Sequence, residues 1–299
     1  MTRTARIGMA TLGAAAAGGV VAASVAALAW QRATERAVAR LGGATMDDAP
    51  AAFAPAQLAG LPAPVARYLA LALVPGQPLI RRARVEHAGT FQSRPGQWSP
   101  FTSVEHASVR PPGFVWDARI RLAPALRMPQ VRVRDGYARG EGAMRGAVAG
   151  LVPVVDQRGT RELAEASLQR WLAEAPWFPT ALLPGAAGAG VAWTALDDRS
   201  ARATVTDHGV TATVDFHFGA DGEIVRTTAD RYRDDRGTPV RTPWVGHFRD
   251  WRRVHGMLVP MEGDVGWVMP DGPQPYWRGR VTRAEYAWRG AGAVPTFPE

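Results

Sequence analysis

The sequence contains no cysteine, which excludes disulfide cross-links, thiolate metal sites and cysteine nucleophiles and leaves the redox compartment open. Lysine is absent too, so all 35 basic side chains are arginines. The 32 glycines and 24 prolines follow no fixed period, which indicates a turn-rich globular chain rather than a fibre. A chain of 299 residues has the length of one large β domain or two smaller ones, and it can bury a substantial core.

Common catalytic and nucleotide-binding motifs are also missing. The sequence has no GxSxG elbow, no HExxH helix and no phosphate-binding P-loop. The glycines at 140, 142 and 146 are spaced one residue too far apart for the dinucleotide fingerprint. No nucleic-acid recognition motif accompanies the positive charge. The sequence therefore predicts no cofactor, no metal and no nucleic-acid partner, and it identifies no protein partner.

The net charge of +8 is unevenly distributed along the chain. Residues 61–155 contain 13 Arg against 5 acidic side chains, whereas residues 156–299 contain 17 Arg against 19 acidic ones. One interpretation is a compositional preference for arginine throughout a basic chain. The other is that the first part of the folded domain faces anionic lipid or an anionic ligand, because Arg binds phosphate in a bidentate manner.

Residues 7–30 carry no charged side chain and consist mostly of Ala, Val, Gly and Leu. At about 1.5 Å per residue, this run is long enough to cross a bilayer core of roughly 30 Å. A cleaved signal peptide is the alternative, because small residues at 27–29 suit a peptidase. We expect a single-pass transmembrane anchor and its flank over residues 1–41, with the domain outside the cytoplasm. The small, proline-punctuated residues 42–64 predict a tether.

After a short predicted helix at Val65–Leu73, the period of the apolar residues changes from that of a helix to that of a strand. Strands are clearest at 114–122 and 210–218, where every second residue is apolar. Others are predicted over 131–137, 143–155, 201–206, 223–233, 240–254, 257–269 and 276–288. We expect a mainly β domain over residues 65–290, followed by a tail at 291–299. Its antiparallel curved sheet of about ten or eleven strands would form a half-barrel or barrel.

One amphipathic helix is predicted within this sheet, over residues 160–174. Thr160 suits the N-cap position, and an apolar stripe recurs at helical period from Ala164 to Ala175. Pro176 ends the helix, because proline cannot continue it and disfavours the helical conformation of the residue before it. Residues 177–184 then form an apolar segment bracketed by prolines. A single amphipathic helix among many strands is expected to lie against the sheet.

The order of these segments resembles that of an uncharacterised bacterial family of membrane-anchored proteins. The resemblance runs from about residue 61 to residue 288, and its most specific pieces are PPGFVW and WLAEAPWFPTALLP. It implies an architecture, without an activity or catalytic residues. More loosely, the strand order with one inserted helix is similar to the lipoprotein-carrier fold, a half-open barrel whose helical lid shelters acyl chains. The chain departs from that fold in its expected peptide anchor, and a fold alone does not confer a function.

Two polar patterns are candidates for chemistry. Val-Glu-His-Ala occurs at 85–88 and at 104–107, and a hairpin turn at 94–97 would place the two copies opposite each other. Adjacent Glu and His point to opposite faces of a strand, so at most two of these side chains per face could bind a metal, and a chance repeat on a solvated face is the alternative. Asp215 and His217 share the polar face of one strand. They are candidates for a hydrolytic acid–base pair, or for cross-strand ion pairs.

Large apolar side chains converge if the helix lies in the mouth of the half-barrel. The candidate ligand-binding residues are Trp116, Trp171, Trp177, Phe178, Leu182, Phe216 and Phe218. Periodicity does not distinguish a filled core from a cavity that holds an apolar molecule. The function predicted from the sequence is a membrane-tethered binding module for an apolar or amphiphilic ligand such as a lipid. The alternatives are a hydrolase that uses Asp215 and His217, and an envelope interaction protein with a filled core.

Overall fold

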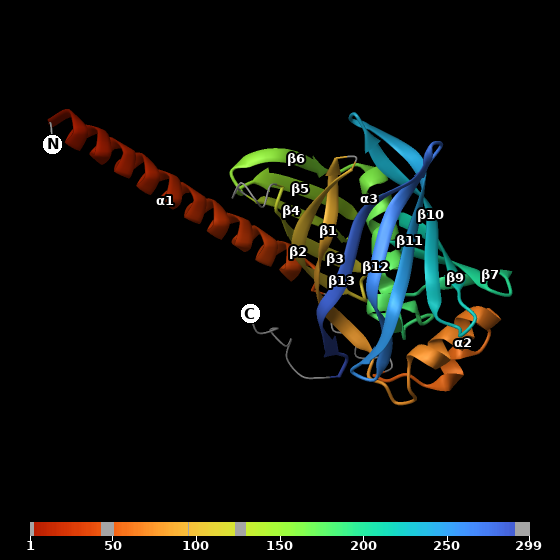
Figure 1. The fold of residues 1–299 in the computed structure, drawn as a ribbon. Coiled ribbons are helices and arrows are strands. Elements are labelled where there is room, and N and C mark those ends of the chain that lie inside the picture. The colour runs from red at the N-terminus through yellow and green to blue at the C-terminus, as the bar shows by residue number, and fades with distance from the viewer. Residues whose placement is uncertain (1–2, 43–50, 95, 123–129, 291–299) are drawn as a thin grey trace.

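The computed structural model describes residues 3–42, 51–94, 96–122 and 130–290, with side chains from Val21 onward except that of Ser93. In this part of the chain, thirteen antiparallel strands form one sheet in the order β6-β5-β4-β3-β2-β1-β13-β12-β11-β10-β9-β8-β7 (Figure 1). The strands are β1 (Ile80–Arg94), β2 (Gln97–Ser108), β3 (Gly113–Ile120), β4 (Val131–Ala138), β5 (Glu141–Val148), β6 (Val152–Arg158), β7 (Ala192–Asp197), β8 (Ser200–Asp207), β9 (Val210–Phe218), β10 (Ile224–Asp235), β11 (Thr238–Val254), β12 (Met257–Met269) and β13 (Gly272–Trp288).

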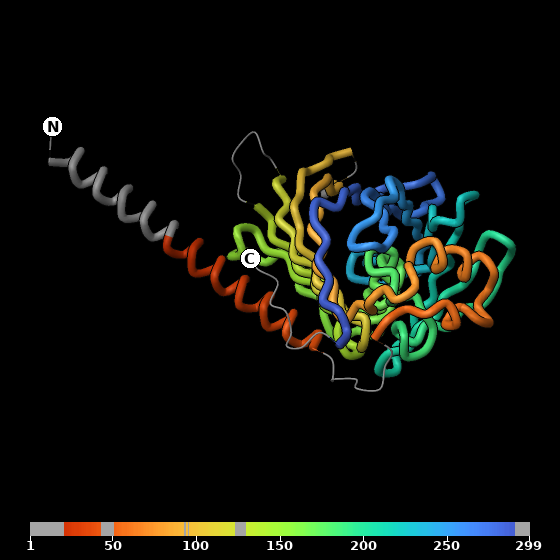
Figure 2. The backbone as a smooth tube through the Cα atoms, turned by 90° about the horizontal axis from the view of Figure 1, so that it is seen from below, coloured from red at the N-terminus to blue at the C-terminus, as the bar shows by residue number. Residues whose placement is uncertain are grey.

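The sheet is strongly curved but does not close. Its edge strands, β6 and β7, do not pair with each other in the described residues. The mainly β, antiparallel half-barrel predicted from the sequence is confirmed, and the closed-barrel alternative is not observed. Figures 1 and 2 show the sheet wrapping around α3 (Arg161–Glu174), which lies on its concave side.

The number of strands corrects the prediction of about ten or eleven. The apolar stretch 143–155 is two strands, because Ala149 and Gly150 adopt positive φ angles of 52° and 73° and turn the chain between β5 and β6. Gly150 lies at this turn, and Pro153 is tolerated because β6 is an edge strand. The other edge strand, β7, is mostly exposed and has no alternation of apolar and polar burial, so no period-2 pattern marks it.

α3 occupies the position predicted for the amphipathic helix. The hydroxyl of Thr160 accepts a hydrogen bond from the Leu163 amide at 3.2 Å and caps its first turn. The helix contacts β9 and β10 on one side and β4 and β5 on the other. It approaches β5 closely at Gly142, where an added Cβ would lie 2.7 Å from the Leu163 carbonyl oxygen.

The apolar segment after α3 folds into two short 3-10 turns, η3 (Ala175–Trp177) and η4 (Pro179–Leu182). Hydrogen bonds fix this segment to the sheet. The Trp177 indole donates to the Pro260 carbonyl at 3.1 Å, the Tyr286 hydroxyl donates to the Trp177 carbonyl at 2.8 Å, and the Ile80 amide donates to the Thr180 hydroxyl at 3.0 Å. These bonds satisfy polar groups that would otherwise be buried without partners, and they close one end of the core.

The helix α1 (Arg3–Arg40) lies outside the sheet, against β3. The Trp30 indole donates to the Asp117 carboxylate at 3.0 Å, and the Arg134 guanidinium lies 4.9 Å from the centre of the Trp30 ring. No helix among the described residues is both long and apolar enough to cross a membrane. Of the predicted transmembrane run, residues 7–20 lie outside the described side chains.

Part of the predicted tether lies against the domain. Phe53 is 3% exposed, and its backbone exchanges hydrogen bonds with Gly76 and Gln77 at 2.8 Å. The 3-10 turn η1 (Pro55–Leu58) and the short helix α2 (Ala63–Ala72) follow, and α2 contacts β8 and β12. Residues 43–50 of the tether and the tail at 291–299 are outside the described residues.

Candidate functional site: a cavity between the helix and the sheet

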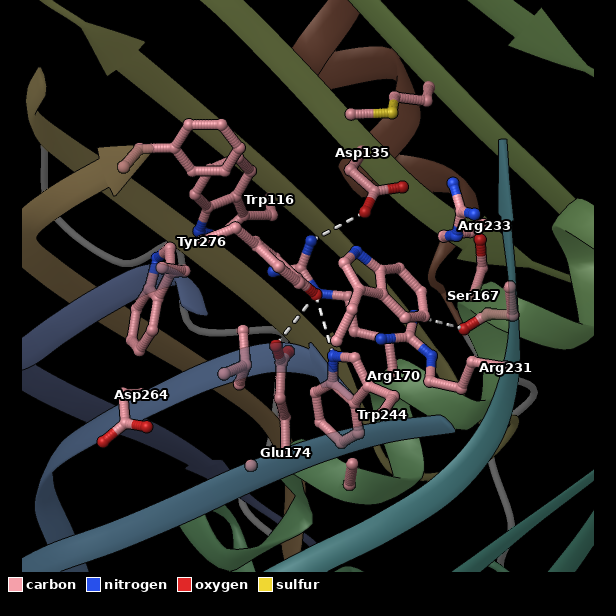
Figure 3. Close-up of a pocket in the computed structure, with 18 of the residues that line it drawn as sticks. Trp116, Asp135, Ser167, Arg170, Glu174, Arg231, Arg233, Trp244, Asp264 and Tyr276 are labelled. Atoms are coloured by element: carbon pink, nitrogen blue, oxygen red, sulfur yellow. Dashed lines mark hydrogen bonds and ion pairs between the residues drawn. The ribbon is translucent and has the colours of Figure 1, made fainter. Parts of the chain in front are cut away.

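A cavity of about 540 Å³ lies between α3 and the concave face of the sheet (Figure 3). This volume falls in the range of roughly 300–1,000 Å³ that is usual for small-molecule pockets. Its walls carry nine aromatic side chains: Phe91, Trp116, Trp177, Tyr232, Trp244, Phe248, Trp267, Tyr276 and Trp277. At its rim, the Gln157 amide of β6 donates to Asp234 of β10 at 2.6 Å, which links the two halves of the curved sheet.

Arg170 on α3 is at the centre of a buried ionic cluster beside this cavity. Its guanidinium donates to Asp135 at 2.7 Å and to Glu174 at 2.9 Å, and it lies 3.7 Å from Glu105. The same group lies 5.0 Å from the centre of the Trp116 ring. Figure 3 shows Arg170 between Asp135 and Glu174. The cluster ties the helix to β2 through Glu105 and to β4 through Asp135, and the acidic side chains around Arg170 compensate its charge.

Glu105, on β2, is 1% exposed and faces this cluster. Burial raises the pKa of its carboxyl group well above the usual range; the Glu174 carboxylate adds to the rise, and Arg170 opposes it. Glu105 therefore holds a proton at pH values where most glutamates are ionised. The Arg170 guanidinium is thus paired within the cluster by Asp135 and Glu174, inside an otherwise apolar wall.

A second cation, Arg231 of β10, lies in another part of the cavity wall. Its guanidinium is 4.8 Å from the centre of the Trp244 ring and donates to the Ala166 carbonyl of α3 at 2.8 Å. Trp244 is held in turn by Tyr276, whose hydroxyl accepts from the indole at 2.9 Å. The cavity is thus apolar over most of its wall, with charged side chains at several places that include the Arg170 cluster and Arg231.

Residues 59–286 match the family model described as a family of unknown function, DUF6920. The chain belongs to this family. The sequence resemblance to an uncharacterised family is thereby confirmed, and membership of DUF6920 brings no known activity. No curated protein matches the chain.

Two solved structures are loosely similar to this DUF6920 protein. A LolA superfamily protein from Nitrosomonas europaea is 10% identical, with 78% of this chain and 93% of that chain covered and a TM-score of 0.39. A β-barrel-like protein of a domain of unknown function, DUF1849, from Brucella abortus is 12% identical, with 70% and 98% covered and a TM-score of 0.25. Both likenesses are too remote to support a conclusion about fold or function.

The residues predicted to bind a ligand fall into two groups in the DUF6920 domain. Trp116 and Trp177 line the cavity. The others are in the core and do not line it: Trp171, Phe178, Leu182, Phe216 and Phe218. The ligand-binding residues predicted from the sequence did not include Arg231, Trp244, Trp267 and Tyr276. Their strands were predicted, but on the strands of Trp244 and Trp267 the glycines Gly246, Gly263 and Gly266 interrupt the apolar alternation that would have marked an inward face.

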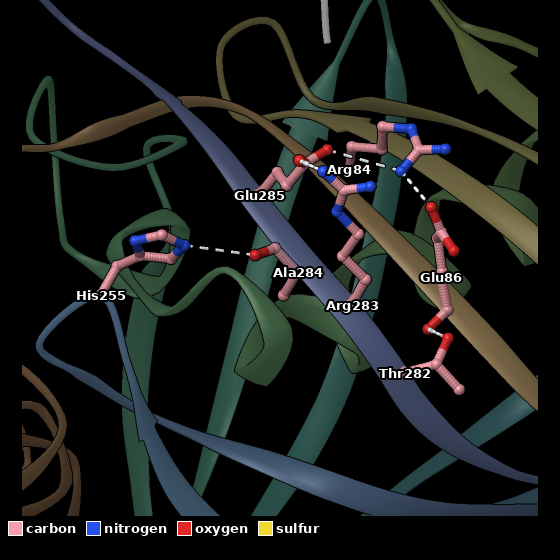
Figure 4. Close-up of polar contacts among 7 residues, drawn as sticks. All are labelled: Arg84, Glu86, His255, Thr282, Arg283, Ala284 and Glu285. Carbon is pink, nitrogen blue, oxygen red and sulfur yellow. Dashed lines mark hydrogen bonds and ion pairs between the residues drawn. The ribbon is translucent and has the colours of Figure 1, made fainter. Parts of the chain in front are cut away.

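The repeated Val-Glu-His-Ala segments lie opposite each other on β1 and β2, with Val85 facing Glu105 and Glu86 facing Val104. His87 and Glu105 point to the concave side and are buried. Glu86 belongs to the outer face, where Arg84 bridges it to Glu285 (Figure 4). In the described part of the chain, no three or more His, Asp or Glu side chains are placed so that they could hold a metal ion.

Asp215 and His217 lie on the outer face of β9, away from the cavity. Both oxygens of Asp215 accept from the Arg202 guanidinium, at 2.6 and 2.8 Å. The ring nitrogens of His217 instead contact Thr228 at 3.0 Å and Arg226 at 3.3 Å. Partial burial and the adjacent Arg226 lower the pKa of His217. These contacts are the cross-strand pairs of a sheet surface, and they leave Asp215 no role in orienting the histidine.

Proposed function

We propose that this DUF6920 protein is a binding module for an apolar or amphiphilic molecule such as a lipid, and that the molecule occupies the cavity under α3. The observation that supports the proposal is the cavity itself. A volume of about 540 Å³ remains between the helix and the sheet, although the surrounding side chains are large aromatics. Protein interiors are normally packed to crystal-like density, so a space of this size indicates a ligand rather than a filled core.

The distribution of polarity in the wall favours an amphiphile. Aromatic rings provide a large apolar contact area at low conformational cost. The Arg170 cluster and Arg231 provide a small number of fixed polar contacts, which is the usual composition of a ligand site. A purely polar ligand would leave most of the aromatic wall exposed to water.

The proposal includes a membrane tether, with the domain outside the cytoplasm. The uncharged run at residues 7–30 supports it. On the described part of α1, Val21, Val25 and Leu28 expose 62%, 60% and 55% of their surface, whereas Trp30 is anchored to the sheet at Asp117. A helix whose apolar side chains point away from its own domain suits a lipid environment. Such a tether would hold the cavity close to a source of amphiphilic ligands.

The experiment is to fill the cavity. Val133 on β4 lines it, and we expect Val133→Phe to reduce binding of an apolar fluorescent probe roughly tenfold or more, because the added ring occupies ligand space. Organic extracts of the purified wild-type chain, analysed by mass spectrometry, are expected to contain an amphiphile that is depleted in the variant.

The matched control is Val240→Phe, the same substitution at an exposed position of β11. It should bind the probe like the wild type. Two results would refute the proposal and leave the filled-core interpretation. One is equal probe binding by both variants. The other is a wild-type protein that does not bind the probe and whose extract contains no bound molecule.

A further inference from the structure

Arg231 is a buried cation whose charge is not compensated by the protein. The residue is 8% exposed and points from β10 toward α3. Its one hydrogen bond in the described residues goes to the Ala166 carbonyl, a neutral acceptor, and its Nε atom is buried without a partner. Figure 3 shows the guanidinium beside Trp244.

The other charged side chains around the cavity have ionic or charge-assisted partners. Arg170 pairs with three carboxylates. Arg233 donates to Thr242 and to Asp235, at 3.0 and 3.3 Å. Asp264 contacts His247 and Arg249. Among the described residues that line the cavity, Arg231 is thus the arginine that forms no ion pair.

A guanidinium in this position needs an anion. Arginine is not deprotonated in proteins, so it cannot relieve its burial by losing the proton, as a buried lysine does. The rings of Trp244 and Trp267, at 4.8 and 5.9 Å, attract the cation through their π faces but supply no hydrogen-bond acceptor. Stacking also fixes the plane of the guanidinium. A fixed, planar fork with free N–H groups is suited to a carboxylate or phosphate, which it binds in bidentate geometry.

We propose that Arg231 binds the anionic head group of an amphiphilic ligand, a carboxylate or a phosphate, while the apolar chain of that ligand lies along the aromatic wall. This inference rests on the binding function proposed above and adds the charge of the ligand to it. The Arg170 cluster does not compete for the head group, because Asp135 and Glu174 already pair with that guanidinium.

The test compares two probes that differ only in charge: a dansyl-labelled medium-chain fatty acid and its methyl ester. Both are titrated into the full chain in nonionic micelles, with protein-free micelles as the blank. We expect the wild type to bind the acid about tenfold more tightly than the ester, as a charge-assisted bidentate contact allows. Arg231→Met should bring the acid to the affinity of the ester and leave the ester unchanged.

Two further variants make the comparison specific. Arg231→Lys keeps the charge without the planar fork, so we expect an intermediate preference for the acid. If Arg231→Met does not fold, this reduced preference in Arg231→Lys tests the proposal instead. Arg241→Met is the control. Arg241 is a neighbouring arginine on β11 that pairs with Glu165 of α3 at 2.7 Å and does not line the cavity, so this variant should keep the full preference. Thermal midpoints of all variants show whether each is folded.

The outcomes separate this inference from the binding function. If neither probe binds the wild type, the proposed function fails and this inference fails with it. If both probes bind with equal affinity, or if Arg231→Met keeps the preference for the acid, the cavity binds ligands but Arg231 does not recognise a head group.

A competition experiment distinguishes the possible sources of the anion. Dodecyl phosphate should displace the acid and inorganic phosphate should not, and equal displacement by inorganic phosphate would overturn the amphiphilic part of the proposal.

Discussion

His87 is a buried histidine with no hydrogen-bond partner for either ring nitrogen in the described residues. Its ring packs between Trp177 and Trp277, at centroid distances of 4.6 and 5.7 Å. Burial lowers the pKa of His87 from 6.5 to about 3, and the positive charge of Arg170 contributes to the decrease. The imidazole is therefore neutral in the folded protein and acts as an aromatic packing group.

This state makes the stability of the domain depend on pH. The unfolded chain binds a proton at His87 below pH 6.5, whereas the folded chain does so only near pH 3. Between these values the unfolded state binds more protons, so the contribution of His87 to the free energy of unfolding is present above pH 6.5 and is lost as the pH falls. We expect His87→Phe to remove this loss, which is about 2 kcal/mol near pH 5 relative to pH 8.

The measurement is urea unfolding of the wild type and of His87→Phe at several pH values. The variant is its own control near pH 8, where both proteins have a neutral ring and differ only in packing. Glu105 on the neighbouring strand is present in both proteins and Arg170 on α3 stays charged in both, so their contributions cancel in the difference. A difference that does not change with pH would show that His87 is protonated alike in the folded and unfolded states.

At the scale of the element, α3 acts as a core helix along one stripe and as a cavity wall along another. Ala164, Leu168, Trp171 and Leu172 are at most 2% exposed and belong to the core. Ser167, Arg170 and Glu174 line the cavity instead. One helix thus holds the sheet together and shapes the candidate site, and substitutions on its two stripes should have separable effects.

Trp171→Ala tests the core stripe. The indole is fully buried, donates to the Ser108 carbonyl at 3.0 Å and packs against Phe178. Its truncation leaves a void and an unpaired carbonyl, so we expect a loss of about 3–5 kcal/mol in the free energy of unfolding. Because Trp171 does not line the cavity, the molecules that remain folded should bind an apolar probe with unchanged affinity.

Chemical unfolding and probe titration of the same samples give both quantities. Arg161→Ala, at the exposed start of α3, is the control and should alter neither. A small loss of stability together with altered probe binding would instead make Trp171 part of a lid over the ligand.

A helix or strand could be predicted from the sequence where its residue pattern is compatible with only one secondary structure. The Thr160 cap and Pro176 stop bound α3, and strict alternation at 210–218 coincides with β9. The residues at 143–155 offered no such signal, because their apolar side chains suit one long strand as well as two short ones. The outline of the sheet therefore follows from local patterns, and its strand count depends on single turn residues such as Gly150.

The apolar character of the cavity could be predicted from the sequence, but its charged residues could not. Large aromatics near a helix indicate an apolar interior, and Trp116 and Trp177 were identified in this way. The charged groups of the wall could not be found from the sequence. Arg231 becomes distinctive only when the fold buries it over Trp244 and leaves it without a carboxylate, and no period or spacing encodes the absence of a partner.

At the scale of the whole molecule, the outer face of the sheet beside α1 is basic. The strand register places Arg119 opposite Arg132, and Arg134 opposite Arg145, on β3, β4 and β5. Asp117 is the acidic residue among them, and its carboxylate is bonded to Trp30 and Thr34. The arginine excess of residues 61–155 is therefore concentrated in part on the surface where α1 lies.

We expect this surface to bind anionic membranes. A chain shortened to residues 26–299 keeps the contact between Trp30 and Asp117, and it should sediment with phosphatidylglycerol vesicles but not with phosphatidylcholine vesicles. The affinity should fall steeply as salt rises through physiological strength, because exposed charges are screened over about 8–10 Å. Replacing Arg119, Arg132 and Arg145 with Gln should weaken binding roughly a hundredfold, at about 1 kcal/mol per arginine.

The control is a triple variant of equal charge on other parts of the surface, Arg161→Gln, Arg199→Gln and Arg236→Gln, three exposed arginines from the second part of the chain. If net charge alone drove binding, the two triple variants would lose the same affinity. A loss confined to the first variant would show that the outer face of β3–β5 contacts the bilayer. The basic surface and α1 would then lie on the same, membrane-facing side of the domain. Binding that ignores lipid charge would contradict the prediction, because apolar contact would then be sufficient without the arginines.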